Sequence, residues 1–271
     1  MPIWKRFDPR YYQLLIQSCL LLWGVGVLGF PVTSLQILVV VTSALVTQIV
    51  CARWFAVPLV WLSTLNTSLS VLLLLHSQSA LWLAIVALLS IASKFVLRWD
   101  NRHMFNPSAF GIVAGLLLTN EVWAAPGQWG HGLWLFLLLA GSGLVIRLGW
   151  QVMLTSISFL LTYAALLFLK AVWLGDPWTI PQHQLQNGAL LLFSFFMLSD
   201  PKTTPVHPLG RVIFGMAVAL LAVWMQFRLY LPNAFLYALV ILTPGIIFLN
   251  RCLNYPAFEW STSITKQEKV L

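Results

Sequence analysis

The stretch ALWLAIVALLSIASKFVLRWDNRHMFNPSAFGIVAGLLLT, residues 80–119, decides the fold class of this chain. It contains two apolar runs, Ala80–Leu97 and Pro107–Thr119, on either side of a short polar link that carries two arginines. A helix needs about 20 predominantly apolar residues to cross a hydrocarbon core about 30 Å thick. The first run approaches that length and the second is shorter. The stretch therefore predicts two membrane helices joined by a polar turn.

The rest of the chain has the same character. Of its 271 residues, 60% are hydrophobic and 8% are charged, and the mean hydropathy is +0.87, whereas soluble domains carry about 25% charged residues. A large soluble core would need helices with polar faces, and the sequence offers almost none. The loops are too short for a soluble domain that binds NAD, a nucleotide or an iron–sulfur cluster. We therefore predict an all-α integral membrane protein.

Ten apolar segments are expected to form its transmembrane helices. The fifth and the eighth are short for full spans, and Thr243-Pro244-Gly245 predicts a bend or break in the last one. The segments are Tyr12–Phe30, Thr33–Val50, Val57–Leu75, Ala80–Leu97, Pro107–Thr119, Gly132–Leu148, Gln151–Leu174, Gln184–Ser199, Val206–Gln226 and Leu231–Leu249.

The basic residues test this count, because cytoplasmic loops carry an excess of Lys and Arg. With a cytoplasmic N-terminus, all but two of the 15 Lys and Arg residues fall on the cytoplasmic side, and the exceptions are Lys170 and Arg228. The alternation predicts ten spans with both termini in the cytoplasm. The net charge of +8 is then explained by topology and by anionic lipid headgroups, so we expect no nucleic-acid partner.

Ten spans with both ends on one side allow two inverted repeats of five helices, as in many transporters. We expect one membrane domain over residues 1–271, with repeats at about 12–123 and 128–250 and cytoplasmic tails at 1–11 and 251–271. A weak echo supports this: SLSVLLLLHSQSALW and LLLFSFFMLSDPKTTP are both serine-bearing apolar runs, and they stop at His76 and Asp200.

Two polar motifs interrupt the apolar pattern, SKFVLRWDNRHMFNPSAFG from residue 93 and SDPKTTPVHPLGR from residue 199. Each holds an Asx-Pro pair, Asn106-Pro107 and Asp200-Pro201, which is a helix-start signal. A helix that starts at membrane depth presents N–H donors suited to an anion. The motifs are equally explained as capped loops with topology-setting arginines. The candidate binding residues are Arg102, Asn106, Pro107, Ser108, Asp200, Lys202, Thr203 and Thr204.

The order FNPSAFG and then FFMLSDPKTTP resembles one family, which contains the membrane protein RnfD of the Rnf electron-transport complex and its counterpart NqrB in the sodium-pumping NADH:quinone reductase. The resemblance covers about residues 12–250. It implies a ten-helix inverted-repeat fold in the bacterial inner membrane, a flavin, and electron transport coupled to Na⁺ or H⁺. The family's Asn-Pro falls on Asn106-Pro107, and its Asp-Pro-x-Thr-x-Pro falls on Asp200, Pro201, Thr203 or Thr204, and Pro205.

The family attaches FMN covalently at a Ser-Gly-Ala-Thr segment, and this sequence has no such segment. The resemblance therefore implies FMN or riboflavin bound non-covalently, with the ring among Phe105, Phe195 and Phe196. It also implies partners: the lipid bilayer, and redox subunits or soluble flavoproteins. An enzymatic role would be that of a component of an ion-translocating oxidoreductase. Three scattered cysteines without CxxC predict no metal site.

Two other functions stay open on the residues alone. The first is a non-redox transporter or channel, in which Asn66, Thr67 and Asp200 would surround a site near the midplane. The second is a scaffold that only anchors redox partners in the membrane.

Overall fold

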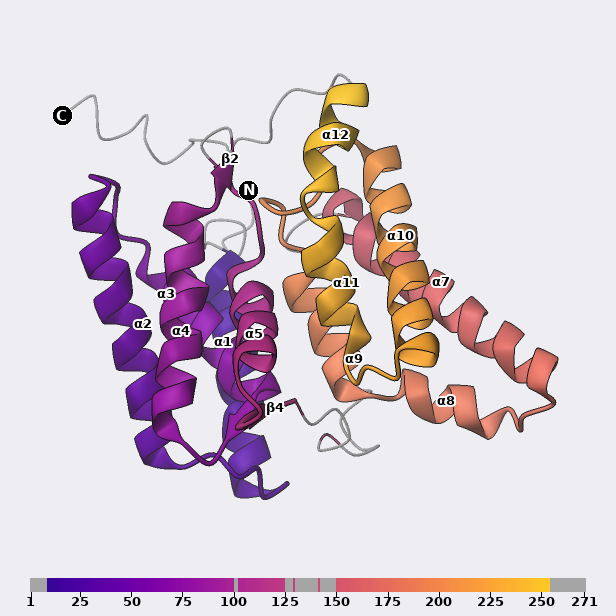
Figure 1. The fold of residues 1–271 in the computed structure, drawn as a ribbon, viewed down its shortest axis with the longest axis horizontal. Coiled ribbons are helices and arrows are strands. Elements are labelled where there is room, and N and C mark those ends of the chain that lie inside the picture. Colours follow the sequence, from indigo (N-terminus) through magenta and orange to yellow (C-terminus); the bar gives the residue numbers. More distant parts are fainter. Residues whose placement is uncertain (1–8, 100–101, 125–128, 130–140, 142–149, 254–271) are drawn as a thin grey trace, which may run out of the picture.

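The computed structural model describes residues 9–99, 102–124, 129, 141 and 150–253. The sixth expected span, Gly132–Leu148, lies outside the described residues apart from Gly141, and so do most residues of the two tails. The described residues form a helical protein of two groups of helices, which lie side by side (Figure 1).

The first group holds the helices of the N-terminal part of the chain. They run alternately between the two ends of the molecule (Figure 1). The helices are α1 (Pro9–Gly26), α2 (Ser34–Trp54), α3 (Trp61–Leu74), α4 (Ala80–Val96) and α5 (Pro107–Leu118).

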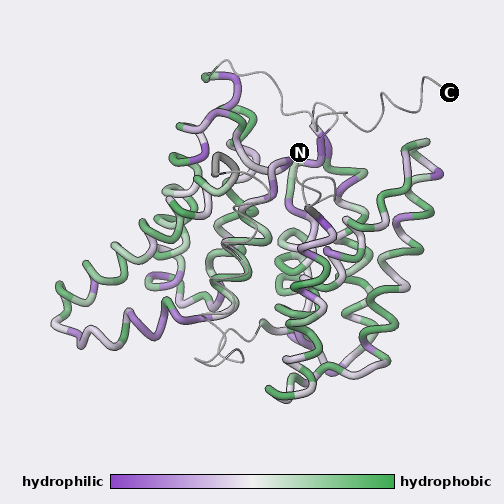
Figure 2. Tube along the Cα trace, turned by 180° about the vertical axis from the view of Figure 1, so that it is seen from behind, coloured by the Kyte–Doolittle hydropathy of each residue, from purple (hydrophilic) through white to green (hydrophobic). Residues whose placement is uncertain are grey.

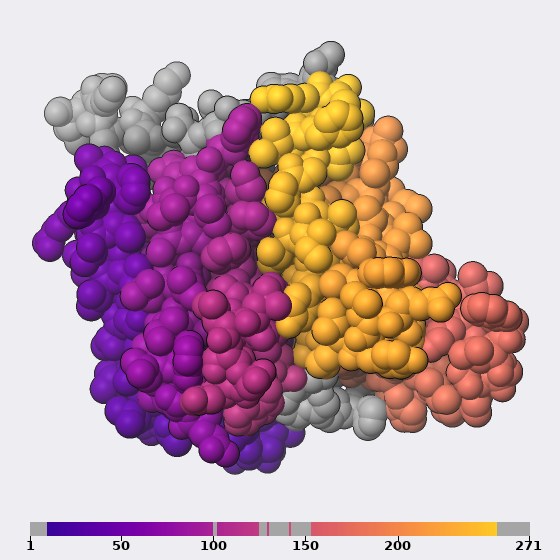
Figure 3. All heavy atoms as spheres, in the orientation of Figure 1, coloured from indigo at the N-terminus to yellow at the C-terminus, as the bar shows by residue number. Residues whose placement is uncertain are grey.

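The second group follows the same alternation, with one helix, α8, lying across its lower end in Figure 1. Its elements are α7 (Trp150–Leu174), α8 (Thr179–Leu185), α9 (Gly188–Leu192), the π-helix η3 (Phe193–Met197), α10 (Pro208–Arg228), α11 (Ala234–Leu242) and α12 (Gly245–Cys252). Space filling shows the two groups in contact along a long seam, where α5 and α11 lie next to each other (Figure 3).

Within the described residues, three helices are long and apolar enough to cross a membrane: Ser34–Trp54, Met153–Leu174 and Pro208–Arg228. The helices α11 and α12 meet at a bend of 52°, and they make up to a fourth span if the bent pair is counted as one. This bend confirms the break predicted at Thr243-Pro244-Gly245. Shorter apolar helices are α3, α4, α5 and Gly188–Met197, so the fifth and eighth segments are short, as predicted. The chain is a multi-pass membrane protein, and the count of ten spans stays a prediction.

Charge is distributed as the topology argument expects. The ends of α2, α4 and α12 meet the starts of α1 and α10 at one end of the molecule (Figure 1), which we call the basic end. Lys170 and Arg228 lie near the last turns of α7 and α10, toward the opposite end. The trace is mostly hydrophobic along the helices, and its hydrophilic stretches gather toward the two ends (Figure 2). The basic end is formed by Arg10, Arg53, Lys94, Arg98, Arg102, Lys202, Arg211 and Arg251.

Two short strand pairs, which the sequence pattern did not predict, connect helix ends. β1 (His76–Ser77) pairs antiparallel with β4 (Val122–Trp123), so the ends of α3 and α5 are tied together. β2 (Arg98–Trp99) pairs antiparallel with β3 (Arg102–His103) in the link between α4 and α5. The second pair fixes the polar link of the opening stretch as a hairpin at the basic end.

Glycines allow close helix packing at two contacts. A methyl group on Gly111 of α5 would collide with Ser90 Oγ and would lie 2.8 Å from the Val86 carbonyl oxygen of α4. A methyl group on Gly215 of α10 would lie 2.5 Å from the Thr155 carbonyl oxygen of α7. Small residues let membrane helices approach this closely.

Two asparagines join the groups in a reciprocal way. Asn106 is the N-cap of α5 in the first group, and its Nδ2 donates to the Met197 carbonyl oxygen of the second group at 3.2 Å. Asn233 precedes α11 in the second group, and its Nδ2 donates to the Ala124 carbonyl oxygen after β4 at 3.2 Å. Each bond therefore ties the start of one helix to the other group.

The helix start predicted at Asp200-Pro201 is wrong. Residues after Pro201 form turns, and the next helix begins at Pro208 with His207 as its N-cap, rather than at Val206. The physical reason is that Asp200 forms bonds inside its own loop, and the pair His207-Pro208 supplies the cap of α10. The eighth segment also differs from its predicted start at Gln184, because it begins at Gly188, where Asn187 accepts a hydrogen bond from the Ala189 N–H at 2.9 Å.

Candidate functional site

The two polar motifs meet at Asn106. Its Oδ1 accepts from the Ala109 N–H at 3.2 Å and from Ser108 Oγ at 2.8 Å, so it caps α5 with Pro107 in the first turn. Its Nδ2 reaches the second motif through the Met197 carbonyl oxygen. The side chain is 6% exposed. One buried amide therefore starts a helix and connects both motifs.

The Met197 carbonyl oxygen is open to a bond from Asn106 because the regular helical hydrogen bonds end at this point. The Leu198 N–H donates to the Phe193 carbonyl oxygen five residues back, which is the π-helical pattern. Four residues after Met197 stands Pro201, which has no N–H to offer an α-helical bond. The Met197 carbonyl oxygen accepts instead from the Asp200 N–H at 3.4 Å and from Asn106. Loss of regular helix here creates the junction between the motifs.

Asp200 organises the loop that follows. Its Oδ1 accepts from the Lys202 N–H at 3.0 Å, and its carbonyl oxygen accepts from Thr204 Oγ1 at 3.1 Å and Thr203 Oγ1 at 3.4 Å. Its Oδ2 lies 3.7 Å from His103 Nε2 of β3. Burial raises the pKa of Asp200, but the hydrogen bond and charge of His103 and the N–H and charge of Lys202 outweigh it, so the pKa lies below its usual value. Asp200 is therefore a carboxylate at neutral pH.

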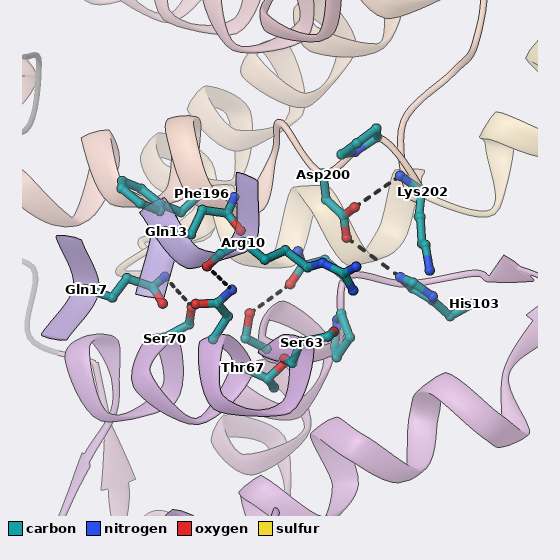
Figure 4. A pocket seen from close by; sticks show the side chains of 15 residues that line it. Arg10, Gln13, Gln17, Ser63, Thr67, Ser70, His103, Phe196, Asp200 and Lys202 are labelled. Carbon is teal, nitrogen blue, oxygen red and sulfur yellow. Dashed lines mark hydrogen bonds and ion pairs between the residues drawn. The ribbon is translucent and has the colours of Figure 1, made fainter. Parts of the chain in front are cut away.

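A polar cavity of about 90 Å³ opens beside this loop, between α1, α3 and the start of α5 (Figure 4). We call it the amide cavity. Its walls are Arg10, Gln13, Gln17, Ser63, Asn66, Thr67, Ser70, His103, Asn106, Pro107, Ser108, Phe196, Asp200, Pro201 and Lys202.

Two helical stripes build most of the amide cavity. Arg10, Gln13 and Gln17 are spaced by three and four residues on α1, and Figure 4 shows Gln17 reaching Ser70 of α3. The facing stripe on α3 holds Ser63, Asn66, Thr67 and Ser70. Residues at such spacing share one face of a helix. Asn66 and Thr67 were candidates from the sequence, whereas the stripe on α1 was missed, although its spacing carried the signal.

The amide cavity contains two buried acceptors without a donor. Gln17 donates from Nε2 to Ser70 Oγ at 2.9 Å, and Asn66 donates from Nδ2 to the Arg10 carbonyl oxygen at 3.2 Å. Gln17 Oε1 and Asn66 Oδ1 are both buried and lack a hydrogen-bond partner within the described residues. Gln17 is 2% exposed. An unsatisfied buried group costs about 1–3 kcal/mol, so the cavity is suited to a group that brings N–H or O–H donors.

Positive charge surrounds the amide cavity. Arg10 and Lys202 line it, and Lys94 Nζ donates to Ser63 Oγ of its wall at 3.1 Å. Asp200 is the acidic residue among its described walls. Arg10 and Lys202 against one carboxylate disfavour a further cation at this position. The orphan acceptors are therefore better matched to neutral donors than to a metal ion.

A second cavity, of about 230 Å³, adjoins the first, and His103 and Lys202 line both. We call it the basic cavity, because three of its walls are cationic. Its walls are Trp99, Arg102, His103, Met104, Lys202, Thr203, Thr204, Val206, Thr243, Ile246, Ile247, Asn250 and Arg251.

The predicted site residues are thus divided between two cavities. The amide cavity takes Asn106, Pro107, Ser108 and Asp200; the basic cavity takes Arg102, Thr203 and Thr204; and Lys202 belongs to both. Of the three aromatics expected around a flavin ring, Phe196 lines the amide cavity. Phe105 instead packs on Phe110, and Phe195 packs against Gly141.

A metal centre receives no support from the described residues, because no group of three or more His, Cys, Asp or Glu side chains gathers there. Two of the cysteines, Cys19 and Cys252, are exposed, and none of the three forms a disulfide within the described part of the chain.

Comparison with known proteins identifies the family of this chain. The model of the NQR2, RnfD, RnfE family matches residues 115–253, which run from within α5 to the end of α12 and include the Asp200 loop. The Asn106 motif precedes the matched range. A search of curated proteins finds no match. Because the family model covers half of the chain, the protein belongs to the NQR2, RnfD, RnfE family.

Proposed function

We propose that this chain is a subunit of the bacterial inner membrane that takes part in electron transport coupled to Na⁺ or H⁺ and binds a flavin non-covalently at the amide cavity. Family membership supports the electron-transport role. The observation that carries the site is the meeting of both motifs at Asn106 and Asp200, beside the orphan acceptors Gln17 Oε1 and Asn66 Oδ1.

The chemistry of the cavity fits one edge of a flavin ring. That edge presents an N–H donor between two carbonyl acceptors. Gln17 Oε1 and Asn66 Oδ1 would accept from the N–H, while Gln13 and Arg10 would donate to the carbonyl groups. At about 90 Å³ the cavity takes an edge rather than a whole cofactor, whose sites measure about 300–1,000 Å³.

A bound flavin would supply reversible one- and two-electron transfer. The chain's own residues would orient it. His103 Nε2 and Asp200 Oδ2 lie 3.7 Å apart on the wall, where they would face the bound ring. Asn106 and Met197 fix the junction between α5 and η3, so the walls from the two groups stay aligned.

The absorption spectrum of the purified protein tests this function. We expect visible flavin absorption after expression with riboflavin, and release of all the flavin by acid because the binding is non-covalent. Gln17→Leu should lower the bound fraction, and Leu22→Ala, on an exposed part of α1, is the matched control. Colourless protein that also fails to bind added FMN or riboflavin would refute the proposal.

The inverted repeat and the ten-span topology are part of the same proposal. The reciprocal bonds from Asn106 and Asn233 and the alternating helices support them. The exposed Cys252 at the basic end and a cysteine introduced at Lys170 should react with impermeant reagents from opposite sides of the membrane. Labelling of both from one side would contradict the topology.

The polar stripes of α1 and α3 favour one alternative, a non-redox transporter or channel for a small polar solute. Gln17 and Ser70 are buried, at 2% and 8% exposed, and a solute with N–H donors would satisfy the orphan acceptors. Solute uptake into proteoliposomes without any electron donor, sensitive to Gln17→Leu, would establish this function in place of flavin binding.

A further inference from the structure

The basic cavity gathers residues from three distant parts of the chain. The β2–β3 hairpin contributes Trp99 and Arg102, the loop after η3 contributes Lys202, and α12 contributes Asn250 and Arg251. The 52° bend between α11 and α12 sets the direction of α12 at this point. Tertiary structure thus brings three cationic side chains, which are scattered in the sequence, to one hollow at the basic end.

The charge of this cavity is one-sided. Arg102, Lys202 and Arg251 line it, and no Asp or Glu stands among its described walls. Burial lowers the pKa of Lys202; Asp200 opposes this, but Arg10, Arg102 and Arg98 add to it. Arg10, Arg98 and Arg102 thus add positive charge around Lys202, beside the carboxylate of Asp200. An anion in the cavity would relieve this repulsion.

Contacts around α12 position Arg251 in this cavity. The Arg251 guanidinium lies over the Trp99 ring, 5.5 Å from its centroid. Asn250 Oδ1 accepts from the Val206 N–H at 3.1 Å, which ties α12 to the loop after η3. A guanidinium stacked on an aromatic ring keeps its planar fork of donors for an oxyanion, and this fork matches phosphate.

We propose that the basic cavity binds the phosphate group of a phosphate ester, through Arg102, Lys202 and Arg251. A volume of about 230 Å³ accommodates a phosphate group and its first attached carbons, and Val206, Ile246 and Ile247 provide an apolar wall for them. Thr203 and Thr204 shape the wall, because their hydroxyls donate to the Asp200 carbonyl oxygen.

Two sources can supply this chemistry, an anionic phospholipid from the surrounding bilayer or a soluble phosphate monoester such as FMN. Basic pockets between membrane helices bind anionic headgroups. The inference does not depend on a flavin ring in the amide cavity, because the cations and their arrangement belong to the basic cavity alone.

The test uses two titrations on the full chain. In the first, nanodiscs of phosphatidylcholine receive rising fractions of phosphatidylglycerol, and native mass spectrometry counts the retained anionic lipid. In the second, FMN and riboflavin are titrated separately, and flavin fluorescence reports binding. We expect Arg251→Gln and Lys202→Gln each to weaken phosphatidylglycerol or FMN binding about five-fold. Riboflavin, which lacks the phosphate, should be unaffected by Arg251→Gln.

Arg53→Gln is the matched control, because Arg53 is an exposed arginine at the end of α2 and lies outside the basic cavity. Arg251 is also exposed, so its replacement removes no core contact, and Arg251→Lys should restore part of the binding.

A loss confined to the lipid titration assigns the site to phospholipid, and a loss confined to FMN assigns it to a monoester. If both variants bind both phosphates as Arg53→Gln does, the proposal is wrong. A flavin-free protein that still retains phosphatidylglycerol through Arg251 would overturn the flavin function alone.

Discussion

Asn106→Ala gives the sharpest test of how the site is built, because one side chain performs two separable tasks. As N-cap of α5 it accepts from the Ala109 N–H, and loss of such a cap costs about 1 kcal/mol. Its Nδ2 also donates to the Met197 carbonyl oxygen in a buried bond, and loss of this bond costs about 0.5–1.5 kcal/mol because the Asp200 N–H still donates to that oxygen. The two terms together predict destabilisation by about 1.5–2.5 kcal/mol.

The matched control is Asn187→Ala. Asn187 caps α9 by accepting from the Ala189 N–H at 2.9 Å, and this hydrogen bond stays within its own turn. It should therefore lose only the cap, about 1 kcal/mol. The difference between the two variants isolates the bond from Asn106 to Met197. Asn106→Asp keeps the acceptor for the cap but places a buried carboxylate oxygen against the Met197 carbonyl oxygen, so its cost should exceed this difference.

Unfolding in detergent, followed by circular dichroism over a denaturant series, measures these free energies. Flavin retention, or solute uptake if the alternative function holds, measures the alignment of the cavity walls. We expect Asn106→Ala to lose both stability and ligand binding, and Asn187→Ala to lose a smaller amount of stability alone. Equal losses in the two variants would refute the reasoning, because the bond to Met197 would then contribute nothing.

The same geometry makes three further predictions. Gly111→Ala should destabilise the protein by about 1–3 kcal/mol, since the added methyl group meets the Val86 carbonyl oxygen. The control Gly26→Ala should not, because nothing lies within 4 Å of the added methyl group. Thermal unfolding measures both. The pKa of Asp200 is lowered in the folded protein, so its contribution to stability is complete above the usual aspartate pKa of about 4 and is lost as the pH falls through the lower folded value. Curves of unfolding free energy against pH should therefore converge in acid for wild type and Asp200→Asn. Parallel curves would contradict the pairing of Asp200 with His103. Gln17→Leu loses the bond to Ser70 Oγ but also removes a buried acceptor without a partner, and because the two effects are similar in size, folding stability should change little while affinity for the ligand falls about five-fold. An unchanged affinity measured by titration would place the ligand elsewhere.

Helix starts and breaks at the site were predictable because they depend on backbone hydrogen bonds and proline effects within a few residues. Asn106-Pro107 starts α5 as expected, since the cap and the proline act within one turn. The break at Thr243-Pro244-Gly245 has the same local cause. Asp200-Pro201 carries a similar signal but starts no helix, because Asp200 binds Lys202 and His103 instead. A local signal therefore fails where tertiary contacts offer the side chain other partners.

The sequence by itself determined the membrane class, the short and broken helices and the gathering of basic residues at loop ends, because apolar length and charge position act segment by segment. Only the tertiary structure decided that the α1 stripe with Gln17 faces the α3 stripe with Asn66, and that the candidate residues divide between an amide cavity and a basic cavity. The physical reason is that nearly uniform hydrophobicity does not specify which side of each helix packs against its neighbours. Close packing at Gly111 and single buried bonds such as Asn106 to Met197 then select which faces meet.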